Sequence, residues 1–295
     1  MKAGYVVFVL SMLLLVGCTG GSSGSGDGTN WKSGTQGVTV DFIQNSPPDT
    51  IYAGEVYSLA LEVRNRGAHP LDRDDLDVSL FFSGFDDTLL TGVNDITVNV
   101  LDKKTVTNPE GGFEIVDLDF GVQIYDDTDS LPQDIRVTAC YEYETVAGLD
   151  ICVDPDPTKD DDDSCRPSGA SGAGGQGAPV AITSVTQEAL KGKTRFTMRL
   201  QNVGTGDVFR GSDCLNIDRR EKDIVAFQGA SIGNIPLTCS ADSTGEIRLV
   251  NGVGTLTCTG DVDVNNPAYL TSLGIRVTYN YKDSVSKRIT IKRIE

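Results

Sequence analysis

The 295-residue chain lacks several features that mark common functional classes. It has one histidine, His69, and no C-x-x-C pair, which argues against a zinc ribbon and a thioredoxin-type site. None of its thirteen asparagines starts an N-x-Ser/Thr sequon, so N-glycosylation is not expected. No apolar run reaches the roughly 20 residues of a membrane-spanning helix. Residues 37–157 show no 3.6-residue apolar period, which disfavours helices and leaves β-strands as the expectation.

The first eighteen residues are the most informative part of what is present. Lys2 precedes an almost unbroken apolar run from Tyr5 to Gly17, whose 13 residues match the apolar region of a secretory signal. The run closes on Leu-Val-Gly-Cys18, which resembles the lipobox of lipoproteins. The resemblance implies that residues 1–17 are removed and that a lipid is attached to Cys18. We therefore expect a lipoprotein on the extracellular face, anchored in the membrane. A plain signal peptide with a chance cysteine, or an uncleaved anchor, is the alternative.

Composition divides the remaining chain into two linkers and two strand-rich segments. Residues 18–36 form a Gly/Ser-rich linker, and residues 158–178 form a second linker rich in Asp and Gly. Residues 37–157 and 179–295 alternate apolar and polar side chains over short runs that end in turn residues. Each segment has about seven such runs. The sequence therefore predicts an all-β protein with two tandem immunoglobulin-like β-sandwich domains.

Two turns are expected inside these segments. The strand from Ile135 to Tyr143 is followed by a second apolar run, Leu149–Val153, which is predicted to return after a short turn. The polar stretch Lys282–Ser286 is predicted as a turn before the last strand.

The net charge of −17 is unevenly distributed along the chain. Residues 36–157 hold 25 acidic and six basic side chains, a net charge of −19, whereas residues 179–295 hold 12 and 15, a net charge of +3. An acidic segment repels nucleic acid, so no nucleic-acid partner is expected. The opposite signs predict that the second domain folds back on the first at low salt.

Two segments indicate a weak internal repeat. Leu61–Gly67 and Leu200–Gly204 each end a long strand in an Asn-containing turn that closes on glycine. At these segments the chain resembles immunoglobulin-like surface modules of the CARDB and NEW3 type. Longer stretches resemble a group of uncharacterised, mostly archaeal, exported lipoproteins. The resemblance implies a fold and a location, and it implies no activity. The longer stretches are Gly34–Gly37, Asn45–Pro48, Ala139–Thr145, Ile151–Cys152, Gly175–Val180 and Asn202–Gly206.

Six cysteines remain once Cys18 is assigned to the lipid. An even number in an oxidising compartment predicts three disulfides. The favoured pairing joins the two cysteines that flank the expected hairpin, joins two neighbouring strands of the second domain, and leaves a bond between the linker and that domain. The expected pairs are Cys140–Cys152, Cys239–Cys258 and Cys165–Cys214.

Clusters of loop aspartates are the candidate metal ligands. Calcium takes six to eight oxygen ligands, which clustered carboxylates and carbonyls supply. The spacing is not that of an EF-hand, because Leu76 occupies the position of the third ligand. A solvated acidic surface is the alternative, and no other cofactor is expected. The candidate calcium ligands are Asp72, Asp74, Asp75, Asp77, Asp154 and Asp156.

Other motifs give weak signals. Gly229–Gly233 matches G-x-S-x-G, but no histidine follows Ser231 and no helical pattern follows the motif, so a turn between strands is expected. His69 is expected in a surface loop. Two pairs of tyrosines at period 2 are predicted to be core residues, with exposed sugar-stacking rings as the alternative. These are Tyr141, Tyr143, Tyr279 and Tyr281.

The sequence therefore predicts a non-enzymatic, lipid-anchored surface protein that acts as a structural, adhesion or partner-binding module. Its expected partners are the membrane, through the lipid on Cys18, and other surface proteins or polysaccharide. A calcium-dependent binding module is one alternative. An accessory subunit of an enzyme that acts on surface polysaccharide is the other.

Overall fold

A computed structural model describes residues 32–71, 77–99, 101–159, 164–168, 170–171 and 176–294. The proposed signal peptide and Cys18 lie outside these residues. The regular structure of the described residues is β-strand, with no α-helix among them, so the all-β prediction is confirmed. The strands form three sheets whose pairs are antiparallel except for one.

Two smaller sheets cover a larger one. The first has the order β1-β3-β7-β5 and the second the order β15-β17-β11-β10-β9. Their strands alternate buried and exposed side chains, as expected for sheets with one face against a core. The bounds of the first are β1 Val38–Phe42, β3 Val56–Asn65, β5 Leu90–Thr91 and β7 Phe113–Val122. Those of the second are β9 Ala170–Ser171, β10 Val180–Leu190, β11 Lys193–Asn202, β15 Thr238–Cys239 and β17 Val253–Asp261.

The larger, central sheet has the order β14-β13-β18-β8-β4-β6. Three short strands extend it: β12 and β2 pair with β18, and β16 pairs with β13. Its bounds are β2 Thr50–Tyr52, β4 Val78–Ser83, β6 Ile96–Val98, β8 Ser130–Val153, β12 Asp207–Phe209, β13 Ile224–Ile232, β14 Ile235–Pro236, β16 Glu246–Arg248 and β18 Tyr269–Lys292.

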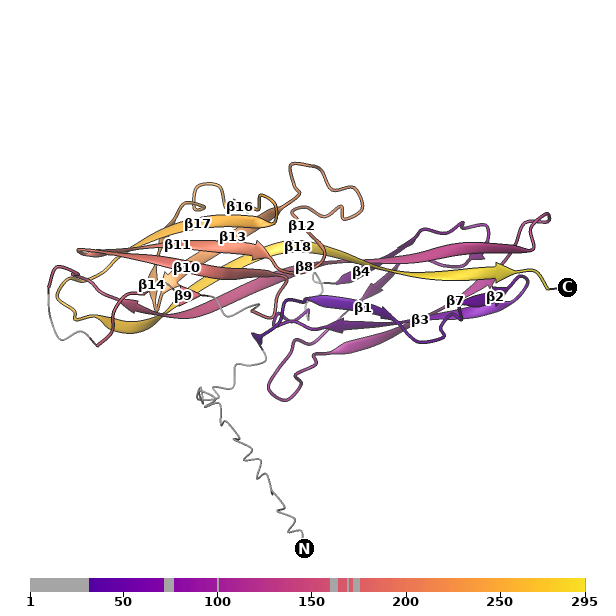
Figure 1. Cartoon of the computed structure of the whole chain (residues 1–295), viewed down its shortest axis with the longest axis horizontal. Helices are drawn as coiled ribbons and strands as arrows, with labels where there is room; N and C mark the ends of the chain where they lie inside the picture. Colours follow the sequence, from indigo (N-terminus) through magenta and orange to yellow (C-terminus); the bar gives the residue numbers. More distant parts are fainter. Residues whose placement is uncertain are drawn as a thin grey trace, which may run out of the picture.

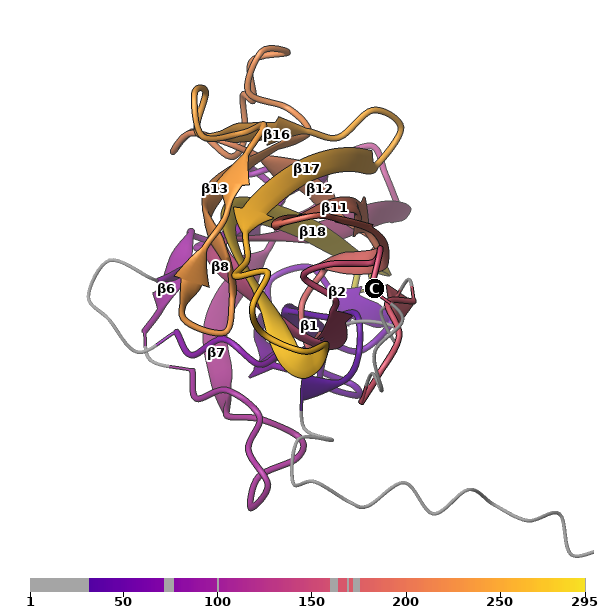
Figure 2. The same ribbon diagram turned by 90° about the vertical axis from the view of Figure 1, so that its left-hand side faces the viewer.

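The molecule is elongated, and the two smaller sheets pack on opposite ends of the central sheet (Figures 1 and 2). We call the end under the β1-β3-β7-β5 sheet the first half and the end under the β15-β17-β11-β10-β9 sheet the second half. In Figure 1 the first half lies on the right and the second on the left. Each half has sheets packed face to face, as in a β-sandwich, and one contiguous hydrophobic core runs through both.

A ribbon of two long strands connects the halves. β8 and β18 are 24 residues each, and they pair without interruption from Tyr269↔Val153 to Lys292↔Ser130. Residues 130–139 and 283–292 lie in the first half, whereas the remainder of both strands lies in the second. The end of the chain therefore returns to the first half (Figure 1).

The two turns expected in this region are wrong. The residues between Tyr143 and Leu149 continue β8, and Lys282–Ser286 continues β18. On β8, every odd-numbered side chain from Ile135 to Ala147 is buried. Because a strand alternates its faces with period 2, one face of the ribbon supplies core residues to both halves. Tertiary burial therefore outweighs the turn preference of the local Gly, Asp and Ser residues.

Candidate functional site

The most organised polar site lies where the two halves meet on the ribbon. We call residues 141–145 of β8 and 279–283 of β18 the joint. Four tyrosines stand there in cross-strand pairs, Tyr143 opposite Tyr279 and Tyr141 opposite Tyr281. Each is at most 4% exposed, so the prediction that they are core residues is confirmed. Neighbouring rings lie 5.7–6.4 Å apart between centroids and form a closed set of four contacts.

One tyrosine closes the turn that ends the long strand β3 of the first half. The Tyr143 hydroxyl donates to Asn65 Oδ1 at 3.0 Å and accepts the His69 N–H at 3.3 Å. Asn65 Oδ1 also accepts the Gly67 N–H, and its Nδ2 donates to the carbonyls of His69 and Leu101. Asn65 is fully buried, so these bonds replace the water that its amide loses on folding.

The second half repeats this arrangement. The Tyr281 hydroxyl accepts the Gly206 N–H at 2.7 Å and donates to Asn202 Oδ1 at 3.4 Å. Asn202 in turn accepts the Gly204 N–H and donates to the Gly206 carbonyl. The weak repeat seen in the sequence therefore extends to the tyrosine that closes each turn.

Glycine is required in both turns by the approach of the tyrosine. A Cβ on Gly67 would overlap the Tyr143 hydroxyl, and a Cβ on Gly204 would overlap the Tyr281 hydroxyl. The Asn-x-Gly pattern therefore has a packing cause in each half.

The remaining tyrosine of each pair binds a strand of a covering sheet, β1 for Tyr141 and β10 for Tyr279. The Tyr141 hydroxyl donates to the Val38 carbonyl at 3.4 Å, and the Tyr279 hydroxyl accepts the Val180 N–H at 3.2 Å. Thr145 strengthens the second contact, since its hydroxyl donates to the Val180 carbonyl and lies 3.0 Å from the Tyr279 hydroxyl. Both covering sheets are thus tied to the ribbon at its centre.

Burial shifts the ionisation of these tyrosines. It raises the pKa of Tyr281 to about 12 and raises the pKa of Tyr141, Tyr143 and Tyr279 further. The cause is desolvation, which disfavours the phenolate. The four hydroxyls therefore stay protonated at neutral pH and hold the joint as hydrogen-bonding groups.

The sequence predicts His69 in a surface loop, but in the structure its side chain is mostly buried against the ribbon. Its side chain is 12% exposed, with Nδ1 3.2 Å from Glu144 Oε2 and the ring edge-on to Tyr143. Glu144 also pairs with Arg276 of β18 at 3.1 Å. A turn of the first half therefore contacts both strands of the ribbon through one carboxylate.

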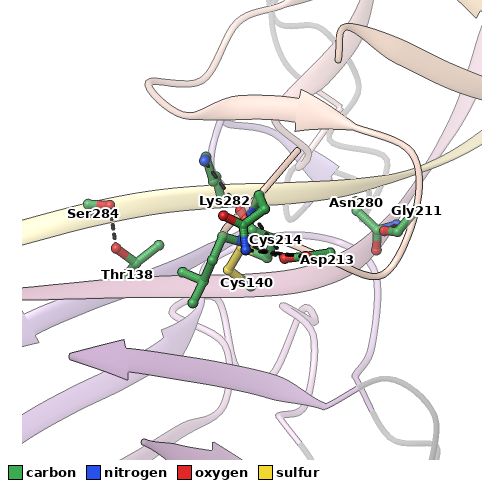
Figure 3. The surroundings of a disulfide bond; sticks show 10 residues. Thr138, Cys140, Gly211, Asp213, Cys214, Asn280, Lys282 and Ser284 are labelled. Carbon is green, nitrogen blue, oxygen red and sulfur yellow. Dashed lines mark hydrogen bonds between the residues drawn. A yellow bond between two sulfur atoms is a disulfide. The ribbon is translucent and has the colours of Figure 1, made fainter. Parts of the chain in front are cut away.

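A loop covers the opposite face of the ribbon. Residues 210–217, which we call the strap, follow β12 and reach over β18 to β8 (Figure 3). Asn280 Nδ2 donates to the Gly211 carbonyl at 2.8 Å, and Lys282 Nζ donates to the Cys214 carbonyl at 3.3 Å. Cys214 forms a disulfide with Cys140 of β8. A small apolar cluster of Cys140, Cys214 and Phe209, with Phe81 and Ile217, supports the strap.

The disulfide pairing differs from expectation in two of three bonds. The structure joins Cys239 to Cys258, as expected. The pairs Cys140–Cys152 and Cys165–Cys214 are wrong, because the observed bonds are Cys140–Cys214 and Cys152–Cys165. Cys140 and Cys152 lie on the same continuous strand, 12 residues apart, so their side chains cannot meet.

The candidate calcium ligands are only partly described. Asp72, Asp74 and Asp75 lie outside the described residues. Asp77 immediately precedes β4, whose Ser79 pairs with Cys140, whereas Asp154 lies 14 residues beyond Cys140 on the same strand path. In this antiparallel register Asp77 faces residue 142, 12 residues from Asp154, so at about 3.3 Å per residue the two groups are roughly 40 Å apart. Within the described part of the chain, no three His, Cys, Asp or Glu side chains gather as metal ligands. Calcium binding stays a prediction.

The two buried carboxylates at the end of β8 have partners. Asp154 Oδ1 accepts the Asp156 N–H at 3.0 Å. Asp156 Oδ1 accepts the Thr158 hydroxyl at 2.5 Å, and its Oδ2 lies 3.0 Å from Lys191 Nζ. The Thr158 hydrogen bond, with help from Lys191, lowers the pKa of Asp156 to about 2. This carboxylate therefore fastens the start of the second linker to the hairpin between β10 and β11.

The serine of the G-x-S-x-G motif belongs to a strand. Ser231 lies in β13 and pairs with Gly274 of β18, so the turn expected over the whole motif is wrong. A nucleophile elbow requires a sharp strand-to-helix turn, which this position does not have.

A scan of protein-family models and a search of curated proteins find no match to this chain. Among the described residues, no helix has the length and apolar character needed to cross a membrane. The three disulfides indicate a protein of the secreted type, outside the cytoplasm.

Sequence reasoning missed the joint, although one signal was present. Tyr143 follows Asn65 by 78 residues, and Tyr281 follows Asn202 by 79. Matching spacing between the turn and a distant tyrosine in both halves would have extended the repeat. The strap had no such signal, because its contacts depend on the course of the ribbon.

Proposed function

We propose that this protein is a lipid-anchored, non-enzymatic cell-surface module whose two immunoglobulin-like repeats, of the CARDB/NEW3-like type, form one rigid body that presents binding surfaces or acts as a structural spacer. The observation that carries the proposal is the joint. A spacer made of two domains on a flexible linker would swing, whereas here 24 paired residues pass through both halves. Bending would break ladder hydrogen bonds and the buried tyrosine contacts together.

The point at which the N-terminal part of the chain joins the body indicates how the lipidated protein would stand on the membrane. Gly34 forms a bridge with Gln176, and its carbonyl accepts the Gly177 N–H at 3.1 Å. The Gly177 carbonyl accepts the Ala68 N–H, next to the turn that Tyr143 closes. The chain from Cys18 thus enters the body beside the joint. By composition, the 13 Gly/Ser-rich residues 19–31 would give a reach of about 20 Å. In the lipidated protein, the joint would lie near the membrane, and the two ends would extend from it.

Replacement of one cysteine tests the anchor. Wild type should partition with membranes and incorporate a radiolabelled fatty acid, and Cys18→Ser should lose both properties while the domains stay folded. A Cys239→Ser/Cys258→Ser chain is the matched control and should keep both. Retention of the label by Cys18→Ser would refute lipidation at this residue.

Isolation of the native protein with whatever is bound to it tests whether it presents a binding surface or acts as a spacer. The protein would be isolated from detergent-solubilised membranes, with and without a calcium chelator. A stoichiometric companion protein identifies a partner-binding module, and recovery of the protein alone favours a spacer. Release of the companion by chelator would support the calcium alternative. A hydrolytic activity that is lost on replacement of one carboxylate pair would refute the non-enzymatic role.

A further inference from the structure

The strap makes the one described covalent link between the ribbon strand β8 and the part of the chain beyond the second linker. Cys140 lies on β8 and Cys214 on the strap, with 74 residues between them in sequence. The other two bonds are local. Cys152–Cys165 spans 13 residues and Cys239–Cys258 spans 19. The Cys140–Cys214 bond therefore sits at the centre of the contact between two segments that residues 154–179 connect.

The strand pairing that this bond crosses has the geometry to form between two copies of the chain as well as within one. β8 belongs to the segment before residues 154–179, and β18 to the segment after them. Pairing β8 of one copy with β18 of another reproduces every ladder bond, tyrosine contact and strap contact without a new interface. Exchange of an identical element is a low-cost route to a dimer.

We infer that the Cys140–Cys214 bond holds this pairing within one chain, and that a second copy is the partner that the joint accepts when the bond is absent. The inference goes beyond the proposed function and does not depend on lipid attachment.

The effective concentration of one segment around the other decides whether the ribbon closes within one chain or between two. With the bond intact, an opened ribbon remains fastened at Cys140, two residues from the Glu142–Asn280 pair at the centre of the joint, so it closes again on itself. Without the bond, the two segments are joined only by the linker. A connection of this length gives an effective concentration in the millimolar range. A second copy at a similar concentration then competes for the strand.

The test compares two disulfide variants of the mature chain, both carrying Cys18→Ser. One is Cys140→Ser/Cys214→Ser, and the control is Cys239→Ser/Cys258→Ser, which removes a bond inside the second half. Folded protein is held at about 0.5 mM in mild urea to open the ribbon, returned to buffer and analysed by size-exclusion chromatography with light scattering.

We expect dimer only in the Cys140→Ser/Cys214→Ser chain, with a dimer fraction at least about tenfold above that of the control and rising with protein concentration. A Cys140→Ser/Cys214→Ser chain that is folded but monomeric at this concentration would overturn the inference. Equal dimer formation by the control would also overturn it.

A second measurement covers the case in which the variant does not fold. A protease site is inserted after Ser168 in the otherwise natural chain, so that cleavage leaves Cys140–Cys214 as the only covalent link between the fragments. Tagged and untagged cleaved proteins are then mixed in mild urea. Exchange of fragments after reductant is added supports the inference. Exchange before reduction, or none afterwards, contradicts it.

Discussion

The two halves are built alike around the joint, but they differ in charge in a way that the chain order conceals. Residues 36–139 hold 20 acidic and six basic side chains, and residues 283–295, which return to this half, add two acidic and four basic ones. The first half therefore carries −12. Residues 140–157 bring five acidic side chains and no basic one to the second half, where residues 179–282 hold ten acidic and eleven basic ones, so this half carries −4.

The charges of the two halves differ from those of the two sequence segments because β8 and β18 each pass from one half into the other. Along the sequence the charges are −19 and +3, which suggested that one domain folds back on the other. In the structure each half receives part of a strand from the other segment, and both halves are acidic. The attraction expected from the linear count is replaced by the hydrogen-bonded ribbon and by the Cys140–Cys214 bond beside the joint.

The halves also differ in how strongly each turn depends on the ribbon. Asn65 is fully buried, and its amide makes hydrogen bonds with Tyr143 and with three backbone groups. Asn202 is only partly buried, makes one backbone bond fewer, and has a longer contact, 3.4 Å, with Tyr281. A change in the joint should therefore lower the free energy of unfolding more when it affects the turn of the first half than when it affects that of the second.

Alkaline pH should give the largest effect. The raised pKa of the four buried tyrosines means that the unfolded chain loses these protons first, near pH 10, so the free energy of unfolding should fall as pH rises above about 10. The expected slope is about 1.4 kcal/mol per pH unit for each tyrosine. Urea midpoints at about pH 8.5 and pH 11 measure it.

The Tyr141→Phe variant is the control for this slope, because its hydroxyl makes only a 3.4 Å bond. It should lose about one quarter of the tyrosine-dependent fall. A fall of unchanged size in this variant would assign the effect to other groups.

Alanine at the two turn glycines should come next. In both Gly67→Ala and Gly204→Ala the new Cβ overlaps a tyrosine hydroxyl, and we expect each to lower the free energy of unfolding by about 2–3 kcal/mol. Because the halves share the ribbon, each variant should unfold in one shifted transition by circular dichroism. Two transitions, of which only one moves, would mean that the halves are independent. Gly148→Ala, which like the other two positions has no positive φ and whose new Cβ meets nothing nearer than Ser272 Oγ at 3.6 Å, is the control for adding a methyl group without a clash.

Replacement of the turn asparagines Asn65 and Asn202 tests whether their difference in burial changes the free energy of unfolding. Asn65→Ala leaves the Tyr143 hydroxyl without an acceptor, removes the side-chain partner of the Gly67 N–H and of the His69 carbonyl, and should cost about 3 kcal/mol. Asn202→Ala should cost about 1–1.5 kcal/mol, because its site is more open and water can replace its bonds. Denaturant titrations of the pair measure both values. Equal losses would show that the difference in burial has no energetic consequence.

The smallest effect should appear in acid. The pKa of Asp156 is lowered to about 2, so its carboxylate stabilises the folded protein above the pKa of an ordinary Asp, about 4, and loses this contribution as pH falls toward 2. Thermal melts at pH 5 and about pH 2.5 should show a smaller decline in Asp156→Asn than in wild type. An identical decline in the variant would exclude this carboxylate as a source.

Local pattern predicted the strands but not their length. Alternation of apolar and polar residues predicted strands in both segments, and two such runs, Tyr57–Val63 and Ile275–Tyr281, do lie in the strands β3 and β18. The same pattern continues through Val146–Gly148 and Asp283–Ser286, where Gly, Asp and Ser suggested turns. Their contacts come from distant residues: Ser284 lies 2.9 Å from the Thr138 hydroxyl, and Asp283 accepts the Thr205 hydroxyl at 2.6 Å. A local window contains none of these partners.

The disulfides show the same limit. Cys239–Cys258 was predictable because its cysteines lie on neighbouring strands, 19 residues apart. Cys140–Cys214 depends on the strap crossing a ribbon that was itself predicted as two hairpins. An error in one turn therefore produced two wrong pairs.

Hydrogen exchange along the ribbon tests the central claim, that the two halves are one rigid body, most directly. Amides of β8 on either side of the joint should exchange with the same free energy, and the amides at 144–148 and 282–286 should be as well protected as their neighbours. Fast exchange confined to these two stretches would mean that they are turns or hinges, and it would contradict the shared ribbon.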